Sequence, residues 1–123
     1  MKVLIIDDEA LVRRSLEKAF RLKGHEVILA EDGEKGLALW LQLRPNAVLI
    51  DVLMPGLTGP QVISQISAEV RSQCFVAAMS AFSGSQSEFE SSEGPRVDLF
   101  ISKPFDDVFS VVERMEKNIK VEA

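Results

Sequence analysis

The most informative stretch of the chain is Ala47-Val48-Leu49-Ile50-Asp51-Val52-Leu53-Met54-Pro55-Gly56. Its first four residues are aliphatic, which is typical of a strand buried on both faces of a sheet. A single carboxylate, Asp51, follows them, and Met-Pro-Gly then indicates a tight turn. The stretch therefore predicts a buried strand that delivers one acid to the edge of a sheet.

The same arrangement recurs along the chain. Three further apolar runs, within residues 3–6, 75–79 and 99–101, also lead into polar side chains. If these strands are parallel, their carboxyl ends meet at one edge of the sheet, which is where open α/β sheets bind ligands. The polar residues expected at that edge are Asp7, Asp8, Asp51, Ser80 and Lys103.

Between the strands, apolar residues recur at the spacing of amphipathic helices. A further short strand is expected over residues 26–30. Strands that alternate with helices predict a parallel sheet with helices on both faces, an α/β fold of five strands and five helices. The expected helices cover residues 9–23, the segment between Gly33 and Pro45, a segment from Thr58 through Val70 that opens with a Thr58–Gln61 capping box, a short part of 83–94, and 105–118.

Length and composition suggest one ordinary globular unit. The 123 residues suit a single domain, 1-123, and a net charge of −5 argues against a nucleic-acid interface. Cys74 has no second cysteine to pair with, which is consistent with a reducing compartment. No signal peptide or membrane-spanning run is recognised, so we expect a cytoplasmic protein with no membrane partner. The single histidine, His25, is expected at the surface.

The combination of polar residues resembles the receiver domain of bacterial two-component response regulators, of the chemotaxis-regulator-like kind. The matching features are the pair Asp7-Asp8, Asp51 before x-x-Met-Pro-Gly, the hydroxyl of Ser80, and Lys103 followed by Pro-Phe. The resemblance covers Lys2 to about Ile119. It implies a flavodoxin-like, doubly wound five-stranded parallel sheet in the order 2-1-3-4-5.

Three carboxylates that converge in one pocket repel each other, so the sequence predicts a cation among them. An all-oxygen ligand set suits Mg²⁺. The resemblance implies that Mg²⁺ binds directly to Asp8, Asp51 and the backbone carbonyl of Leu53, and through water to Asp7.

The resemblance also implies a signalling role. Asp51 would be the phosphoacceptor for a sensor histidine kinase or a phosphotransfer protein, while Lys103 and Ser80 would contact the phosphoryl oxygens. Ser80 and Phe100 would form a switch that changes the surface of the fourth helix, fifth strand and fifth helix. A downstream effector protein, a fused output domain or a homodimer formed on phosphorylation would read that surface. Such a domain is not an enzyme beyond slow autodephosphorylation.

Other interpretations remain open at this point. Phe100 fits an ordinary core aromatic as well as a switch, and Lys103 fits a structural ion pair. The whole chain could be a phosphorylation-independent, pseudo-receiver interaction module. A Mg-dependent aspartyl phosphatase also uses an acid and a metal on an α/β sheet, but such enzymes typically place two acids two residues apart after the first strand, whereas Asp7 and Asp8 are adjacent.

Overall fold

A parallel five-stranded sheet lies at the centre of the computed structural model, which describes residues 1–81, 97–105 and 107–121. The strand order is β2-β1-β3-β4-β5 and every neighbouring pair is parallel, as expected. The strands are β1 (Lys2–Ile6), β2 (Glu26–Ala30), β3 (Ala47–Asp51), β4 (Phe75–Ser80) and β5 (Leu99–Ser102).

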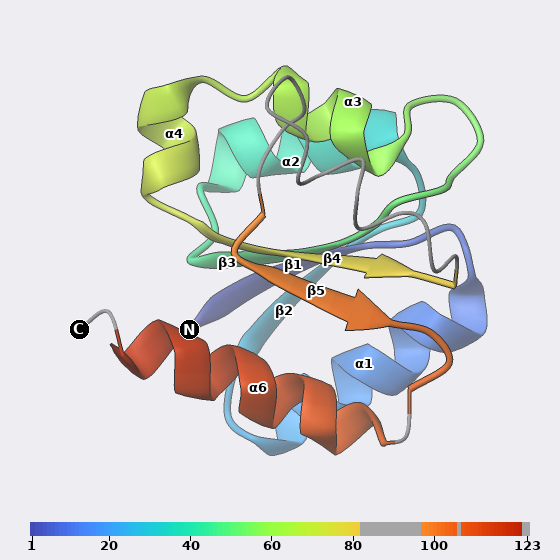
Figure 1. The fold of residues 1–123 in the computed structure, drawn as a ribbon, viewed down its shortest axis with the longest axis vertical. Coiled ribbons are helices and arrows are strands. Elements are labelled where there is room, and N and C mark those ends of the chain that lie inside the picture. Colours follow the sequence, from blue (N-terminus) through green and yellow to red (C-terminus); the bar gives the residue numbers. More distant parts are fainter. Residues whose placement is uncertain (82–96, 106, 122–123) are drawn as a thin grey trace.

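Helices cover both faces of this sheet. In Figure 1, α1 (Ala10–Leu22) and α6 (Val108–Val121) lie below the sheet. Above it lie α2 (Gly33–Leu43), α3 (Gly59–Ser64) and α4 (Ala68–Ser72). The arrowheads of β4 and β5 both point to the right of the view, so the carboxyl edge of the sheet lies there.

Alternation along the strands divides the core into two halves. In β1, Leu4 and Ile6 pack with the apolar side chains of the α2–α3–α4 face, whereas Val3 and Ile5 pack with those of α1 and α6. All four are fully buried. Since side chains of a strand alternate between faces, a strand that is covered on both sides must be apolar at successive positions. This is the physical reason for the uninterrupted aliphatic runs.

The expected third helix is wrong in one respect, because it is broken into α3 and α4. A capping box opens α3 as predicted, with the Thr58 hydroxyl accepting from the Gln61 N–H and the Gln61 side chain accepting from the Thr58 N–H. After Ser64 the backbone tightens, and the N–H of Ile66 bonds to the carbonyl of Ile63. Ser67 then caps α4 by accepting from the Val70 N–H. The helix expected within residues 83–94 lies outside the described residues.

The surface placement expected for His25 is also wrong. Its side chain is only 12% exposed and lies against the ring of Phe20. Its Nε2 is 2.8 Å from a carboxylate oxygen of Glu116 in α6, and its Nδ1 is 3.1 Å from the amino group of Met1. His25 therefore ties the turn before β2 to the last helix.

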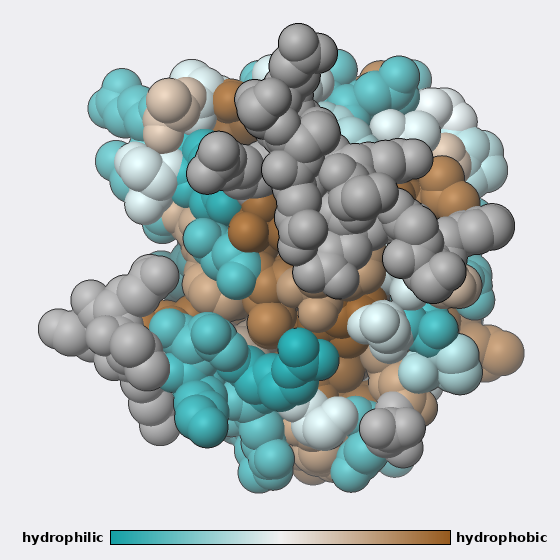
Figure 2. Space-filling model, in the orientation of Figure 1, coloured by the Kyte–Doolittle hydropathy of each residue, from teal (hydrophilic) through white to brown (hydrophobic). Residues whose placement is uncertain are grey.

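The distribution of polar and apolar residues on the molecular surface agrees with this arrangement of sheet and helices. Figure 2 shows hydrophilic side chains over α6 at the lower left and apolar surface across the middle of the same face, near β5. Among the described residues, none of the helices has both the length and the apolar character needed to cross a bilayer.

Candidate functional site

Two neighbouring strands bring the first acids together at the carboxyl edge. Ile6 in β1 pairs with Ile50 in β3, so the residues that follow them, Asp7 and Asp51, lie side by side. By alternation both continue the rows that face α1 and α6. Each carboxylate is largely buried, with Asp7 fully inaccessible and Asp51 6% exposed.

Four acids make up the site. Carboxylate oxygens of Asp7, Asp8, Glu9 and Asp51 lie within 4.8 Å of one another. The sequence predicted three of these acids and missed Glu9, although it directly extends the pair Asp7-Asp8. Glu9 has the extended backbone of an N-cap at the start of α1, yet its side chain makes no capping bond. It approaches Lys103 instead, with an oxygen 3.4 Å from Nζ.

Lys103 reaches this cluster from the segment after β5. Its ammonium donates to Asp7 Oδ2 at 2.7 Å and lies 3.5 Å from Asp51 Oδ2. Burial alone would lower the pKa of Lys103, but the hydrogen bond to Asp7 and the charges of Asp7, Asp51 and Glu9 outweigh it and raise the pKa. Lys103 therefore remains an ammonium among the acids. The peptide bond to Pro104 is cis.

One ammonium does not balance the carboxylates. Burial and the charge of Asp7 raise the pKa of Asp51 to about 6, with Lys103 opposing them in part. Burial likewise raises the pKa of Asp7, against the hydrogen bond from Lys103. A hard divalent cation among these oxygen donors would relieve the same repulsion. The donor set thus fits Mg²⁺, with all ligand atoms being oxygens and two of the carboxylates, Asp8 and Glu9, exposed at the mouth.

In the turn after β3, neighbouring backbone segments pack closely against Asp51. The N–H of Val52 donates to the carbonyl of Met79, and the N–H of Gly59 donates to the carbonyl of Val52. A Cβ at Gly59 would lie 2.6 Å from the carbonyl oxygen of Asp51, so only glycine permits this approach of α3. The Leu53 side chain is 49% exposed, and its carbonyl remains a predicted ligand.

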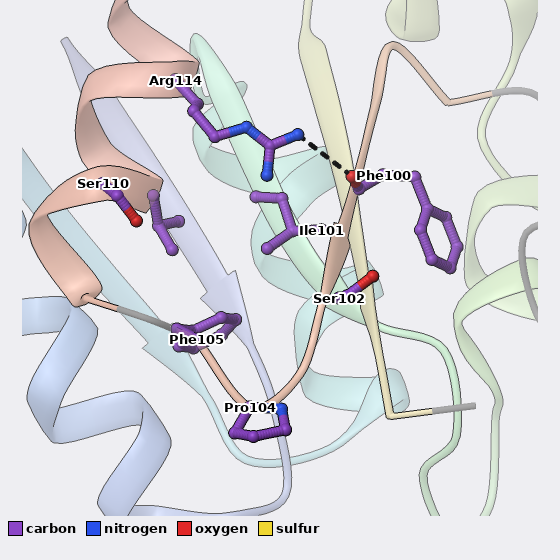
Figure 3. Close-up of a pocket in the computed structure, with 8 residues that line it drawn as sticks. Phe100, Ile101, Ser102, Pro104, Phe105, Ser110 and Arg114 are labelled. Atoms are coloured by element: carbon purple, nitrogen blue, oxygen red, sulfur yellow. Dashed lines mark hydrogen bonds between the residues drawn. The ribbon is translucent and has the colours of Figure 1, made fainter. Parts of the chain in front are cut away.

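Ser80 and Phe100 lie on the other face of the sheet. Ser80, 3% exposed, ends β4 one position beyond Met79, the register partner of Asp51. Alternation places it on the α2–α3–α4 face, where Phe100 also packs. Figure 3 shows the Phe100 ring on the opposite side of β5 from Ile101. Phe100 pairs across the strands with Ala78, a small residue.

A cavity of about 320 Å³ lies on the other side of this strand, between β5 and α6. Arg114 of α6 reaches over it and donates to the carbonyl of Phe100 at 3.4 Å (Figure 3). Phe105, Val111 and Ile101 supply its apolar lining. Phe100 is therefore half-buried between two environments, with its side chain packed against the core of the α2–α3–α4 face and its carbonyl beside the cavity.

Comparison with solved structures places this fold among known ones. A response regulator receiver domain protein (CheY-like) from Methanospirillum hungatei gives a TM-score of 0.84 at 22% identity, over 97% of this chain and 93% of that one. TrrA of Thermotoga maritima, a response regulator solved in complex with Mg²⁺-BeF, gives 0.81 at 26% identity over 95% and 97%.

Curated sequences match over a shorter part. The chain is 43% identical over 68 residues to a probable transcriptional regulator ycf27 of Porphyridium aerugineum, and 41% identical over 66 residues to the response regulator MprA of Mycolicibacterium vanbaalenii. These alignments include 55% and 54% of this chain but only 28% and 29% of the relatives. The chain thus covers less than a third of their length.

The family model described as the response regulator receiver domain matches residues 3–113. This range contains β2 to β5, all of β1 except Lys2, every acid of the edge cluster and Lys103. Since the match extends over nearly the whole chain, the chain belongs to the response regulator receiver domain family.

Proposed function

We propose that residues 1-123 form a single phosphoacceptor domain of a two-component phosphorelay, with Asp51 as the residue that is phosphorylated. The observation that carries the proposal is the placement of Asp51 at the open edge of the sheet, with Lys103 Nζ 3.5 Å away and three further acids beside it. A nucleophilic carboxylate next to one ammonium and a set of metal-binding oxygens is the arrangement that phosphoryl transfer requires.

In the proposed reaction a carboxylate oxygen of Asp51 attacks the phosphorus of a phosphohistidine on a sensor histidine kinase or a phosphotransfer protein. The new O–P bond forms as the P–N bond breaks, and the electron pair of the broken bond returns to the imidazole of the donor. Lys103 offsets negative charge on the phosphoryl oxygens, and the Ser80 hydroxyl donates to one of them. With its pKa near 6, Asp51 is mostly ionised at neutral pH, as a nucleophile must be.

The proposed cofactor is Mg²⁺, held directly by Asp8, Asp51 and the carbonyl of Leu53, and through water by Asp7. When bound, the ion would neutralise the acidic cluster and the incoming phosphoryl oxygens. The oxygen-only donor set and the Mg²⁺-BeF complex of TrrA, a relative at 26% identity, support this choice.

The proposed output is a change in the surface around β5 and α6. Ser80 and Phe100 would act as the switch, because both lie on one face of the sheet and on neighbouring strands. A separate effector protein or a fused output domain would read this surface, and phosphorylated chains could pair through it as a homodimer. Because the phosphodonor kinase uses ATP, the proposed compartment is the cytoplasm.

The test is to incubate the chain with acetyl phosphate and Mg²⁺ and to measure its intact mass. We expect the wild type to gain one phosphoryl group and Asp51→Asn to gain none. Asp32→Asn is the matched control, because Asp32 is an acid that caps α2 and is not one of the four clustered acids, and asparagine caps equally well. It should be labelled like the wild type.

The other outcomes distinguish the remaining interpretations. A wild type that stays unlabelled with every donor would support a phosphorylation-independent interaction module. A wild type that hydrolyses the donor rapidly over many turnovers would support an aspartyl phosphatase.

A further inference from the structure

The backbone that carries the first two acids is anchored at several atoms. Asp7 donates its N–H to the carbonyl of Ala30 at 3.2 Å, and its own carbonyl accepts from Nη1 of Arg13 at 2.6 Å. Its two carboxylate oxygens accept from the Glu9 N–H at 2.8 Å and from Lys103 at 2.7 Å. Among the described residues, the bond from Arg13 is the one hydrogen bond on the peptide unit that joins Asp7 to Asp8.

Asp8 depends on that peptide unit for its direction. The carbonyl of Asp7 and the N–H of Asp8 belong to one planar group, so holding the oxygen fixes the plane from which Asp8 projects. Asp8 itself is exposed, and within the described part of the chain its carboxylate forms no hydrogen bond and no ion pair. In the described part of the chain, therefore, no contact of the Asp8 side chain directs its carboxylate toward Asp51.

Arg13 is well suited to hold this peptide. It lies in the first turn of α1, where its N–H bonds to the carbonyl of Glu9, and its side chain is half-buried. Beside it, a cavity of about 220 Å³ separates it from Glu31 and Lys35. Arg14, the next residue, is exposed, and its side chain forms no hydrogen bond or ion pair with the described residues. The helix thus offers two adjacent arginines, of which one touches the site.

We propose that Arg13 is a positioning residue for the cation site, and that it aims the Asp8 carboxylate by holding the peptide between Asp7 and Asp8. This inference rests on the proposed function, because it concerns the Mg²⁺ ligands assigned there. When a residue that hydrogen-bonds a metal ligand and orients it is removed, the affinity for the metal typically falls by about 10- to 100-fold.

The direction in which Mg²⁺ affinity changes in an Arg13 variant distinguishes a positioning role of Arg13 from an effect of its charge. A guanidinium near a cation site repels the cation, so removing the positive charge alone would strengthen Mg²⁺ binding. Removing the hydrogen bond would weaken it, because Asp8 would then sample several directions. Weaker binding in an Arg13 variant therefore cannot come from the lost charge.

The experiment measures Mg²⁺ binding by isothermal titration calorimetry for the wild type, Arg13→Met, Arg13→Gln and the control Arg14→Met. We expect Kd to rise about tenfold in both Arg13 variants and to stay the same or fall slightly in Arg14→Met. Thermal unfolding in the presence of a chelator should stay close to that of the wild type in all three variants, since the bond holds the segment between β1 and α1 and no apolar side chain of the core is changed.

Three results would overturn the proposal. Arg13 variants that bind Mg²⁺ as Arg14→Met does would show that Arg13 does not orient the ligand. Failure of both Arg13 variants to fold would assign Arg13 to the fold instead of the site. A wild type that binds no Mg²⁺ but is phosphorylated would remove this inference and the proposed cofactor, while leaving Asp51 as the phosphoacceptor.

Discussion

The charge of Asp51 opposes the folded state in the absence of a cation. Burial and the neighbouring charge of Asp7 raise its pKa from 3.8 to about 6. The folded chain therefore holds this proton more tightly than the unfolded chain does. Between roughly pH 4 and pH 6 the native state binds more protons, so the free energy of unfolding should increase as the pH falls through this window.

This gives a prediction for unfolding by urea with a chelator present. From pH 7.5 to pH 5 the Asp51 contribution should stabilise the wild type by about 1 kcal/mol, and Asp51→Asn should lack this increment. Comparing the pH dependence of the two proteins removes the groups that they share. Equal pH dependence would mean that Asp51 ionises in the folded chain as it does in the unfolded one.

The sequence could predict the acids that end strands but not the residues that reach them from elsewhere. Asp7 and Asp51 follow buried aliphatic runs, so the register of a parallel sheet is enough to bring them together. Glu9 and Arg13 belong to the loop and first turn of α1, and their roles depend on which way each side chain turns. His25 meets Glu116 across 91 positions of sequence, a separation at which no local pattern operates.

Helix α3 approaches the end of β3 so closely that the size of its first residue, Gly59, affects the geometry of the site. A methyl group at Gly59 would lie 2.6 Å from the Asp51 carbonyl oxygen and 3.1 Å from the Cα of Val52, both backbone atoms that move only with their segments. We predict that Gly59→Ala lowers the free energy of unfolding by about 1–3 kcal/mol and slows phosphorylation of Asp51 by acetyl phosphate.

Gly36→Ala is the matched comparison. A methyl group there would lie 2.5 Å from Cδ1 of Ile6, and the three atoms it would approach most closely all belong to that side chain and not to the backbone. It should lower stability in denaturant titrations while leaving the rate of labelling close to that of the wild type. If both variants lose stability alike and label alike, the close approach at Gly59 serves packing only.

Helices α3 and α4 show where a prediction from the spacing of apolar residues fails. Val62, Ile63, Ile66 and Val70 follow helical spacing without a break and are all buried, so the pattern predicts one helix. The break comes from Ser67, whose hydroxyl caps the next helix and competes with helix continuation. Side-chain hydrogen bonds of this kind are local and strong enough to divide an element whose apolar face is continuous.

Across the whole molecule, the proposed chemistry and the proposed response lie on different faces of one sheet. Asp7, Asp51 and Lys103 meet at the carboxyl edge, with the two acids in rows that face α1 and α6. Ser80 and Phe100 belong to rows that face α2, α3 and α4. In the proposed response, a phosphoryl group on Asp51 would draw the Ser80 hydroxyl and the end of β4 toward the edge, and this movement would act on Phe100.

The last prediction tests this route by separating phosphorylation from its consequence. In the wild type, phosphorylation should change amide hydrogen exchange in β5 and α6, where Arg114 meets the Phe100 carbonyl beside the cavity. Ser80→Ala should still be labelled at Asp51, as intact mass would show, but the change in exchange should be much smaller. Ser102→Ala is the control, because Ser102 lies opposite Ser80 in the sheet register and is exposed. An undiminished response in Ser80→Ala would mean that the signal leaves the site by another path, with Lys103, which joins the acids to the segment after β5, as the next group to change.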